Sequence, residues 1–419
     1  MEKIACLFPG QGSQYTGMGQ KLYTEFPIAR QTFEEANDVL GFDLQNLCFN
    51  GSLLELNQTE NMLCAILTCS VAAFRVYMKE IGVAPQYLAG HSLGEYTALT
   101  CSEALRFEDA LKIVTFRSRL AQKAADESGG ILAIVNDIAI GAVEEQCRGI
   151  SGESRFVAVA GYNSPTQAIV AGHQDGITAL QDILMEMGGQ VTPLFTSPPF
   201  HCTLMQGAAD ALTLELAKYN FSVPRWTVIS NLDALPYTGS AQIRHHLSEQ
   251  MVHPVQWQAT IKYLEQQGVT IAIEIGSRAV LTNLVSANTE RMEAFSFGQQ
   301  DDRQFLLECL AGRGKNPGQT GFLTRCLAIS DCTKNRNWNE AEYQKGVEEP
   351  YERIEQLQNQ LELTGQNPTE EQMKLAAEML RSILVTKKTP EGELRARFRE
   401  LFAATGTTAL FTGFLPPEP

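Results

Sequence analysis

The sequence predicts an α/β fold with three parts. These are an α/β-hydrolase-like large subdomain with a parallel sheet, an inserted ferredoxin-like small subdomain, and a helical C-terminal extension. Three observations predict this fold. Short apolar runs alternate with amphipathic helical segments over residues 1 to about 295. Within that stretch, residues 128–197 follow a rhythm of their own, and from about residue 315 the chain becomes charged, glutamine-rich and helical in period.

The large subdomain is expected to comprise residues 1–127 and 198–295. Four short apolar segments are its predicted strands: Ile4–Phe8, Tyr87–Gly90, Trp226–Ser230 and Ile271–Ile275. Four segments with helical periodicity are its predicted helices: Gln14–Glu25, Ala65–Lys79, Leu93–Cys101 and Phe107–Ala125. Single strands separated by helices are typical of a mostly parallel sheet.

The small subdomain is expected at residues 128–197. Its predicted elements alternate in a βαββαβ order: Ile131–Val135, Ile140–Cys147, Phe156–Ala160, Gln167–Ala171, Ile177–Met187 and Val191–Phe195. This order is typical of a ferredoxin-like fold. The segment Gly161–Pro165 has turn-forming residues and is expected to connect the two middle strands.

The C-terminal extension, residues 315–419, contains no recognisable catalytic motif. Its periodicity predicts helices over Ala341–Leu363 and Thr369–Leu384, with breaks at residues 314–318, 365–368 and 387–390. We interpret it as a helical appendage that packs on the body or on a partner. A solvated helical extension is the alternative.

Composition limits the class of protein. The net charge of −15 disfavours a nucleic-acid partner, which normally requires a basic face. Ten scattered cysteines form no Cys-x-x-Cys pair and no cluster at zinc spacing, as in proteins of a reducing compartment. No apolar run approaches the roughly 18 residues that span a bilayer, and the first residues lack the features of a secretory signal. We therefore expect a cytoplasmic protein without a membrane or nucleic-acid partner, and a monomer by default.

The run Gly-His-Ser-Leu-Gly at Gly90–Gly94 matches the G-x-S-x-G nucleophile elbow. An apolar strand precedes it and a helical segment follows it, and the glycines permit a sharp turn with a strained serine at its tip. The backbone N–H of Leu93 would then point to where an oxyanion forms. The pattern predicts Ser92 as a nucleophile; a tight turn that happens to contain serine is the alternative.

A serine nucleophile needs a base. The chain has six histidines, and His201 follows the stiff segment Ser197–Phe200, which contains two prolines. A rigid loop that delivers a histidine into a cleft suits a general base. From the spacing alone, a histidine at the start of a helix remains an equal alternative.

Five motifs occur in one order at matching spacing: Phe8–Gln14, Gly90–Tyr96, Arg117 within Phe-Arg-Ser-Arg-Leu-Ala-Gln, Asn163–Pro165 and Phe200-His201. On these motifs the chain resembles the malonyl-CoA:acyl carrier protein transacylases. That family includes acyltransferases of fatty acid synthases and trans-acting acyltransferases of modular polyketide synthases. The resemblance covers about residues 1–300 and not the extension.

The resemblance implies ping-pong transfer of a malonyl group from malonyl-CoA to the phosphopantetheine thiol of an acyl carrier protein. Ser92 would carry the acyl ester, and His201 would act as base and then as acid. The backbone N–H groups of Gln11 and Leu93 would form the oxyanion hole, and the carbonyl of Gln250 would orient His201. No metal and no bound cofactor is implied, since coenzyme A enters as the thioester substrate.

The resemblance also implies which residues select the acyl group. Arg117 would hold the malonyl carboxylate through its guanidinium fork, which suits a bidentate contact. Phe200 and Asn163 would be substrate-binding residues, and Phe200 before the base is a malonyl-type choice. An acetyl group would leave the Arg117 charge unpaired and should be disfavoured.

Two departures from the family pattern keep alternatives open. Met62–Ala65 replaces Thr-Gln-Pro-Ala, so Leu63 stands in place of an active-site glutamine, and Gly276–Arg278 replaces Gly-Pro-Gly. The first alternative to transfer is a proofreading hydrolase that cleaves acyl groups from carrier proteins. The second is a catalytically idle docking protein. The retained Arg117 favours transfer, and the unusual extension suggests, by analogy, a polyketide pathway.

Overall fold

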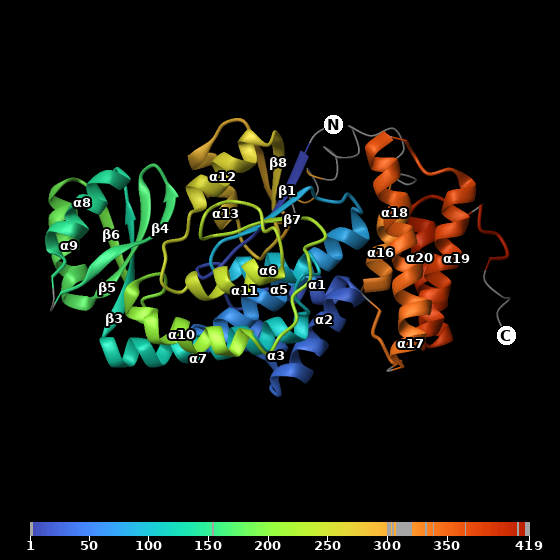
Figure 1. Cartoon of the computed structure of the whole chain (residues 1–419), viewed down its shortest axis with the longest axis horizontal. Helices are drawn as coiled ribbons and strands as arrows, with labels where there is room; N and C mark the ends of the chain where they lie inside the picture. Colours follow the sequence, from blue (N-terminus) through green and yellow to red (C-terminus); the bar gives the residue numbers. More distant parts are fainter. Residues whose placement is uncertain are drawn as a thin grey trace. The chain divides into compact units, whose positions relative to one another are not determined.

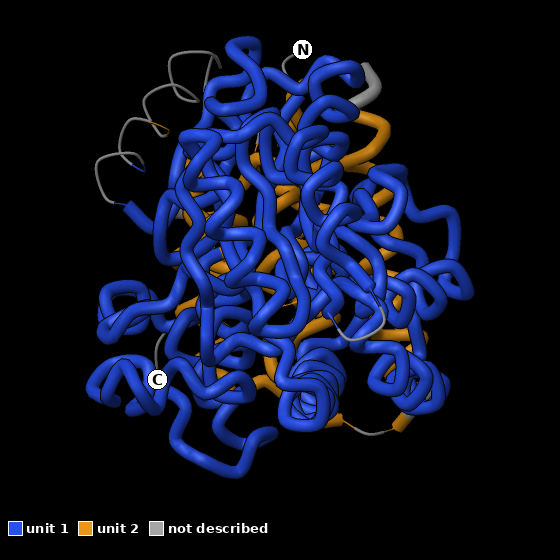
Figure 2. Tube along the Cα trace, turned by 90° about the vertical axis from the view of Figure 1, so that its left-hand side faces the viewer, with its two compact units in different colours: residues 1–73, 85–303 blue, residues 74–84, 304–419 orange. Residues whose placement is uncertain are grey.

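The computed structural model of the chain describes residues 3–152, 155–299, 303, 306, 321–331, 333–337, 339–364, 366–408 and 410–414. The chain divides into two compact units (Figure 2). The first comprises Met1–Ala73 and Pro85–Arg303, and the second Phe74–Ala84 and Gln304–Pro419. The predicted break at residues 314–318 lies outside the described residues.

The large subdomain of the first unit contains a five-stranded parallel sheet (Figure 1). Its strands are β1 (Lys3–Phe8), β2 (Tyr87–Gly90), β7 (Thr227–Ile229), β8 (Val269–Glu274) and β9 (Glu293–Ser296). They lie in the order β7-β2-β1-β8-β9, and every neighbouring pair is parallel. The four predicted strands are confirmed. The short edge strand β9 lies in a segment for which no strand was predicted.

Helices cover both faces of this sheet. Helices α12 (Trp257–Gln266) and α13 (Val280–Asn288) bury their apolar sides against strand residues such as Leu7. Helix α6 (Leu93–Cys101), which begins directly after Ser92, contacts β1, β2 and β7. The further helical segments of the subdomain are α1 (Gln20–Glu25), α2 (Pro27–Leu40), α3 (Leu44–Asn50), α4 (Leu53–Leu56), residues 59–73 of α5 (Thr59–Glu80), α7 (Phe107–Ser128), η1 (Thr203–Met205), α10 (Gln206–Leu216) and α11 (Ser240–Glu249).

Helix α1 is shorter than predicted. The prediction placed a helix over Gln14–Glu25, whereas α1 covers only Gln20–Glu25. Gly17 and Gly19 have φ values of +98° and +78°, a left-handed backbone conformation that an α-helix cannot contain and that glycine adopts without a Cβ clash. The prediction was therefore wrong over the first six residues of that segment.

The inserted subdomain has the predicted βαββαβ order. Its elements are β3 (Gly130–Asn136), α8 (Ile140–Ile150), β4 (Val157–Ser164), β5 (Gln167–His173), α9 (Gln174–Glu186) and β6 (Gln190–Leu194). The antiparallel sheet order β4-β5-β3-β6 is ferredoxin-like, and α8 and α9 cover one face (Figure 1). The predicted turn at Gly161–Pro165 was wrong, because β4 continues to Ser164 and a tight turn at Pro165 and Thr166 makes the hairpin.

The second unit is helical, as predicted for the extension. Its described helices are α16 (Phe322–Asp331), α17 (Glu340–Tyr343), the π-helical turn η2 (Gln344–Glu348), α18 (Glu349–Thr364), α19 (Glu370–Thr386) and α20 (Glu391–Ala404). Apolar side chains of α16, α18, α19 and α20 form one core. The helix predicted over Ala341–Leu363 is interrupted by the π-helical turn η2. In this turn Gly346 lies against Thr386 of α19.

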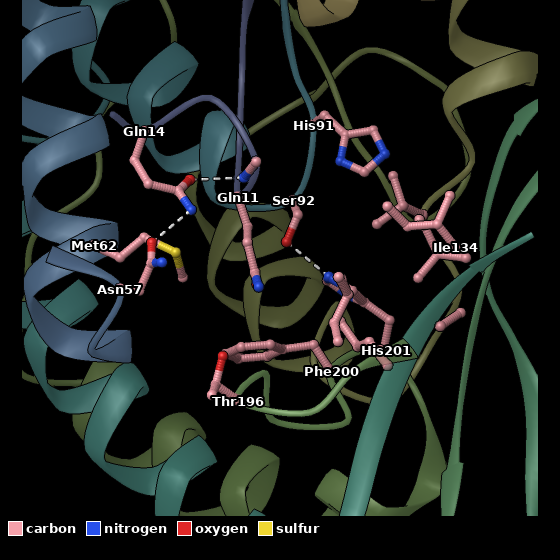
Figure 3. Close-up of a pocket in the computed structure, with 16 residues that line it drawn as sticks. Gln11, Gln14, Asn57, Met62, His91, Ser92, Ile134, Thr196, Phe200 and His201 are labelled. Atoms are coloured by element: carbon pink, nitrogen blue, oxygen red, sulfur yellow. Dashed lines mark hydrogen bonds between the residues drawn. The ribbon is translucent and has the colours of Figure 1, made fainter. Parts of the chain in front are cut away.

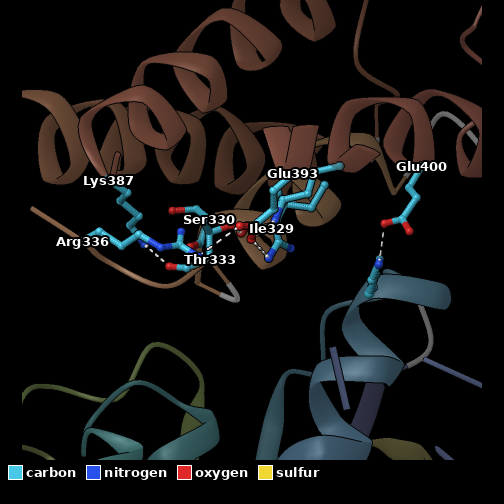
Figure 4. Close-up of polar contacts among 9 residues, drawn as sticks. Ile329, Ser330, Thr333, Arg336, Lys387, Glu393 and Glu400 are labelled. Carbon is cyan, nitrogen blue, oxygen red and sulfur yellow. Dashed lines mark hydrogen bonds and ion pairs between the residues drawn. The ribbon is translucent and has the colours of Figure 1, made fainter. Parts of the chain in front are cut away.

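Polar contacts tie the loops of the second unit to its helices (Figure 4). The buried Lys387 donates to the carbonyl of Ser330 at 2.7 Å. Helix α5 (Thr59–Glu80) ends in this unit, and its Lys79 pairs with Glu400 at 2.5 Å. Arg325 donates to the carbonyl of Glu80. The unit thus has its own core and its own hydrogen-bond network.

Helix α5 is the one described helix that is long and apolar enough to cross a membrane. The most apolar 18-residue window of α5 has a mean hydropathy of 1.5. The expectation that no apolar run approaches the length that spans a bilayer was therefore wrong. However, 89% of that window is buried inside the protein, and a buried core helix passes the same test of length and composition.

Candidate active site

Ser92 lies on a sharp turn between β2 and α6, as the elbow pattern predicts. Its φ is +54°, a conformation that costs energy for any residue with a side chain. Close packing requires the flanking glycines, since a Cβ on Gly90 would lie 1.9 Å from Gly94 and a Cβ on Gly94 would lie 1.9 Å from the carbonyl oxygen of Phe8. The turn therefore presses against the end of β1 and presents the serine at the start of α6.

His201 lies within hydrogen-bond distance of this serine. Ser92 Oγ and His201 Nε2 are 2.7 Å apart, shown as a dashed line in Figure 3. On the other side of the ring, His201 Nδ1 lies 2.6 Å from the backbone carbonyl oxygen of Gln250. A carbonyl only accepts hydrogen bonds, so Nδ1 carries the proton and Nε2 is left as the acceptor for the serine hydroxyl.

The imidazole of His201 is neutral at physiological pH. Burial, and after it the charges of Arg117 and His91, lower its pKa to about 3, although the hydrogen bond to the Gln250 carbonyl acts in the raising direction. His201 is 5% exposed and itself has a positive φ of +66°. A buried neutral imidazole with a free Nε2 lone pair can accept the hydroxyl proton.

Two backbone amides near the nucleophile are available as donors. Among the described residues, neither Gln11 N–H nor Leu93 N–H donates a hydrogen bond to another protein group. By contrast, the Ser92 N–H is taken by the side-chain oxygen of Asn231 at 2.7 Å. Leu93 is the first residue of α6, where the helix dipole also favours negative charge.

Arg117 projects from α7 into the protein interior and is 1% exposed. One amino group donates to the side-chain oxygen of Gln250 at 3.2 Å, and its Nε has no partner among the described residues. Its guanidinium carbon lies 4.4 Å from the ring centre of Phe200 and 5.4 Å from that of Tyr96. Burial lowers its pKa. A buried guanidinium with an unused donor and no carboxylate within 4 Å among the described residues is suited to bind an anionic group.

A cavity of about 260 Å³ opens on Ser92 and His201. Gln11 and Phe200 also line it, and apolar residues of the small subdomain such as Ile134 form the opposite wall (Figure 3). The cavity therefore lies between the two subdomains of the first unit, with a polar floor and an apolar wall, as is typical of small-molecule sites.

Of the predicted site residues, Gln11, Ser92, Phe200 and His201 line the cavity, whereas Leu93, Arg117, Gln250, Asn163 and Leu63 lie behind its wall. The side-chain oxygen of Asn163 lies 2.8 Å from His91 Nε2, and it is His91 that lines the cavity. Met62 lines the cavity, whereas Leu63 is 2% exposed and is not part of its wall. The side chain that faces the cavity from this turn of α5 is thus a methionine, an apolar and adaptable one.

Three residues of the site have no counterpart in the sequence predictions. Glu95 lies in the first turn of α6, and Asn231 and Tyr237 follow β7. Glu95 accepts hydrogen bonds from the backbone N–H of Asn231 at 2.8 Å and from the hydroxyl of Tyr237 at 2.7 Å. The one signal for this network in the sequence was Glu95, an acidic residue directly after the elbow motif. Its partners lie more than 130 positions away.

The fold and the site geometry together define a class, the acyl-transfer enzymes in which a serine on a strand-to-helix elbow lies within hydrogen-bond distance of a histidine. The chain belongs to the acyl transferase domain family, whose profile matches residues 6–316. Among the described residues, no group of three or more His, Cys, Asp or Glu side chains could hold a metal ion.

Relatives with curated names support this assignment. The chain is 35% identical over 395 residues to a malonyl CoA-acyl carrier protein transacylase of Bacillus subtilis, covering 94% of this chain and 98% of that protein. It is 37% identical over 309 residues to the enzyme of the same name from Escherichia coli K12, covering 74% of this chain and 100% of that protein. The first of these matches is too long to end within the first unit, so the similarity extends into the second.

Solved structures share the fold of the first unit. A malonyl-transacylase in complex with a type II polyketide synthase acyl-carrier protein has 36% identity and a TM-score of 0.71, covering 74% of this chain and 100% of that one. FabD from Acinetobacter baumannii gives the same identity and TM-score, covering 74% of this chain and 99% of that one.

Proposed function

We propose that this protein transfers malonyl groups from malonyl-CoA to the phosphopantetheine thiol of an acyl carrier protein. The observation that carries the proposal is the buried Arg117, whose guanidinium packs against the cavity-lining Phe200 and keeps an unused donor. A neutral acyl group would leave this charge buried and unpaired, whereas the malonyl carboxylate would neutralise it. The names of the relatives point to the same substrates.

In the first half-reaction, Ser92 Oγ attacks the thioester carbonyl carbon while His201 Nε2 takes the hydroxyl proton. The N–H groups of Gln11 and Leu93 stabilise the tetrahedral oxyanion. When the carbon–sulfur bond breaks, His201 returns the proton to the departing sulfur, so CoA leaves as the free thiol. The malonyl group remains as an ester on Ser92.

In the second half-reaction, His201 deprotonates the phosphopantetheine thiol, and its sulfur attacks the seryl ester. The ester bond breaks, and the proton goes back to Ser92 Oγ. The Gln250 carbonyl stabilises the imidazolium that forms in each half-reaction through its bond to Nδ1. A thioester is already activated, so a dyad without a carboxylate partner suffices.

The proposal includes a cytoplasmic location and catalysis without a bound cofactor. The eight cysteines of the described chain are buried thiols outside any disulfide, which fits a reducing compartment. The first half-reaction is tested by incubating the protein with malonyl-CoA and mapping the adduct by mass spectrometry. Adding a holo-carrier protein should move the adduct to its phosphopantetheine arm, and free malonate as the only product would contradict transfer.

A further inference from the structure

Glu95 is a buried carboxylate inside the site, 1% exposed, that touches no reacting atom. Its Oε1 accepts from Asn231 N–H and Tyr237 O–H, and its Oε2 accepts from Gln250 Nε2 at 2.5 Å. No cation of the described chain lies within 4 Å of it to form an ion pair. Burying such a charge is expensive unless the donors around it require it.

One arm of this network holds the nucleophile turn. Asn231 donates its backbone N–H to Glu95 and its side-chain Nδ2 to the carbonyl of Gly90 at 2.6 Å, and its Oδ1 accepts the Ser92 N–H. The side-chain amide of Asn231 thus hydrogen-bonds to the backbone of the turn that carries Ser92 at two points, Gly90 and Ser92. That amide is fixed in turn by Glu95.

The second arm reaches Arg117 through the Gln250 side chain. A carboxylate accepts hydrogen bonds only, so Gln250 must present its Nε2 to Glu95. Its Oε1 is then left to accept from Arg117 at 3.2 Å, while the same Nε2 donates to the Ser92 carbonyl at 3.0 Å. If the amide were reversed, donor would face donor at Arg117 and the Ser92 carbonyl would lose a partner.

We propose that Glu95 is a positioning residue that fixes the Gln250 amide and thereby holds Arg117 in the orientation that selects a carboxylated acyl group. The inference rests on the proposed function of the site. Arg117 has no carboxylate partner within 4 Å among the described residues. Its hydrogen bond to the neutral Gln250 amide therefore orients the guanidinium and leaves its charge available to pair with a substrate carboxylate. Glu95 thus acts on substrate choice through one intervening amide.

The surroundings of Glu95 are compatible with a carboxylate that changes charge near neutral pH. Burial, with a smaller contribution from Asp233, raises its pKa to about 7 against the lowering effect of the hydrogen bonds from Tyr237, Asn231 and Gln250. The titratable or charged groups that act on it are Tyr237, Asp233, Tyr96 on α6 and Arg117 on α7. When protonated, Oε2 becomes a donor and favours the reversed Gln250 amide, which is the state that Glu95→Gln would also favour.

The test compares Glu95→Gln with wild type for seryl-ester formation from malonyl-CoA and from acetyl-CoA. The variant keeps the shape and the Oε1 acceptor but lets Gln250 reverse. Loss of a hydrogen bond to a charged group corresponds to about a 10-fold effect or more. We expect the malonyl-to-acetyl ratio of kcat/KM to fall by about that factor, while acetyl loading slows by no more than about threefold through the lost bond to the Ser92 carbonyl.

Glu274→Gln is the matched control. Glu274 ends β8, is 1% exposed, and burial likewise raises its pKa to about 7. Among the residues that the structure describes, its carboxylate bonds to the start of α13 and to no member of the Glu95 network. This variant should leave the malonyl-to-acetyl ratio unchanged, even where it lowers thermal stability.

A pH profile and a double variant separate positioning from a merely structural role. In wild type the malonyl-to-acetyl ratio should fall toward the Glu95→Gln value as the pH drops through 7, and in Glu95→Gln it should be flat. In a Gln250→Leu background, Glu95→Gln should change the ratio by less than about twofold, because the connecting amide is gone. Equal loss of both substrates in Glu95→Gln, or a ratio that does not move, would overturn the proposal.

The failure of the proposed function gives a different result. If wild type forms no malonyl ester at all, that function fails, and the Glu95 inference is then decided by reaction of Ser92 with phenylmethylsulfonyl fluoride. The lost bond to the Ser92 carbonyl should slow this reaction about threefold in Glu95→Gln and not in Glu274→Gln. Identical rates in all three proteins would overturn the inference.

Discussion

Replacing Arg117 by alanine tests how the site selects its acyl group. The guanidinium is buried, lies over the rings of Phe200 and Tyr96, and hydrogen-bonds to the neutral side chains of Gln250 and Tyr96. Its Nε is unpartnered among the described residues. The alanine variant therefore removes a charge that has no protein counter-ion at hydrogen-bond distance there, and no existing ion pair is broken.

The magnitude follows from that geometry. Truncating one partner of a buried, hydrogen-bonded charge pair costs about 2–5 kcal/mol. A value of about 3 kcal/mol corresponds to a loss of about 150-fold in kcat/KM for malonyl-CoA. An acetyl group has no carboxylate and gains nothing from the guanidinium, so acetyl loading should be unchanged or faster in the variant.

The assay measures release of the CoA thiol in a single turnover, with intact-protein mass spectrometry to identify the ester. Arg119→Ala is the matched control, because Arg119 lies on the same helix but is exposed and pairs with Glu60 at 2.8 Å. It should load both substrates like wild type. An equal loss of malonyl and acetyl loading in Arg117→Ala would refute the carboxylate-binding role.

Three further predictions concern the elbow, the pH response and the second unit. Gly94→Ala should abolish Ser92 labelling by phenylmethylsulfonyl fluoride, because its Cβ would lie 1.9 Å from the Phe8 carbonyl oxygen. The control Gly141→Ala in α8 should leave labelling intact, because its Cβ meets nothing within 4 Å. Normal labelling of Gly94→Ala would contradict the geometry of the elbow. The pKa of Glu95 is raised to about 7 on folding, so its contribution to stability is largest below pH 4.5, and about 3 kcal/mol of it is lost as the pH rises through 7. In urea unfolding, the free energy of unfolding of Glu95→Gln should lack this part of the wild-type pH dependence. Parallel plots of the free energy of unfolding against pH for the two proteins would count against this prediction. Lys387→Met should lower the free energy of unfolding by about 1–3 kcal/mol, because it removes the buried Nζ donor that the carbonyl oxygens of Ser330 and Thr333 share. Calorimetry measures this loss, and Ser92 malonylation should not change.

The sequence predicted what depends on local chemistry. The elbow was recognisable because the strand, the two glycines and the helix are adjacent in the chain, and the structure places them as predicted. The ferredoxin-like order followed from alternating patterns. The contact between His201 and the Gln250 carbonyl came only from the family resemblance, and the structure has this contact at 2.6 Å.

What the sequence did not predict depends on tertiary contacts. Glu95 reads as a charged residue in the first turn of a helix, where solvent exposure is the ordinary expectation. Its burial is set by Asn231, Tyr237 and Gln250, which lie 136, 142 and 155 positions away. Likewise, the order of residues in Met62–Ala65 does not tell which side chain faces the cavity, because that depends on the rotation of α5 about its axis.

The central claim is that Ser92 accepts a malonyl group and passes it to a carrier thiol. Peptide mapping after a short incubation with malonyl-CoA should place one malonyl group on Ser92 and none on Ser92→Ala. A holo-carrier protein should then remove it faster than water does and appear in the malonylated form. A malonyl group on another residue, or loss of the ester at one rate with and without the carrier, would contradict the account.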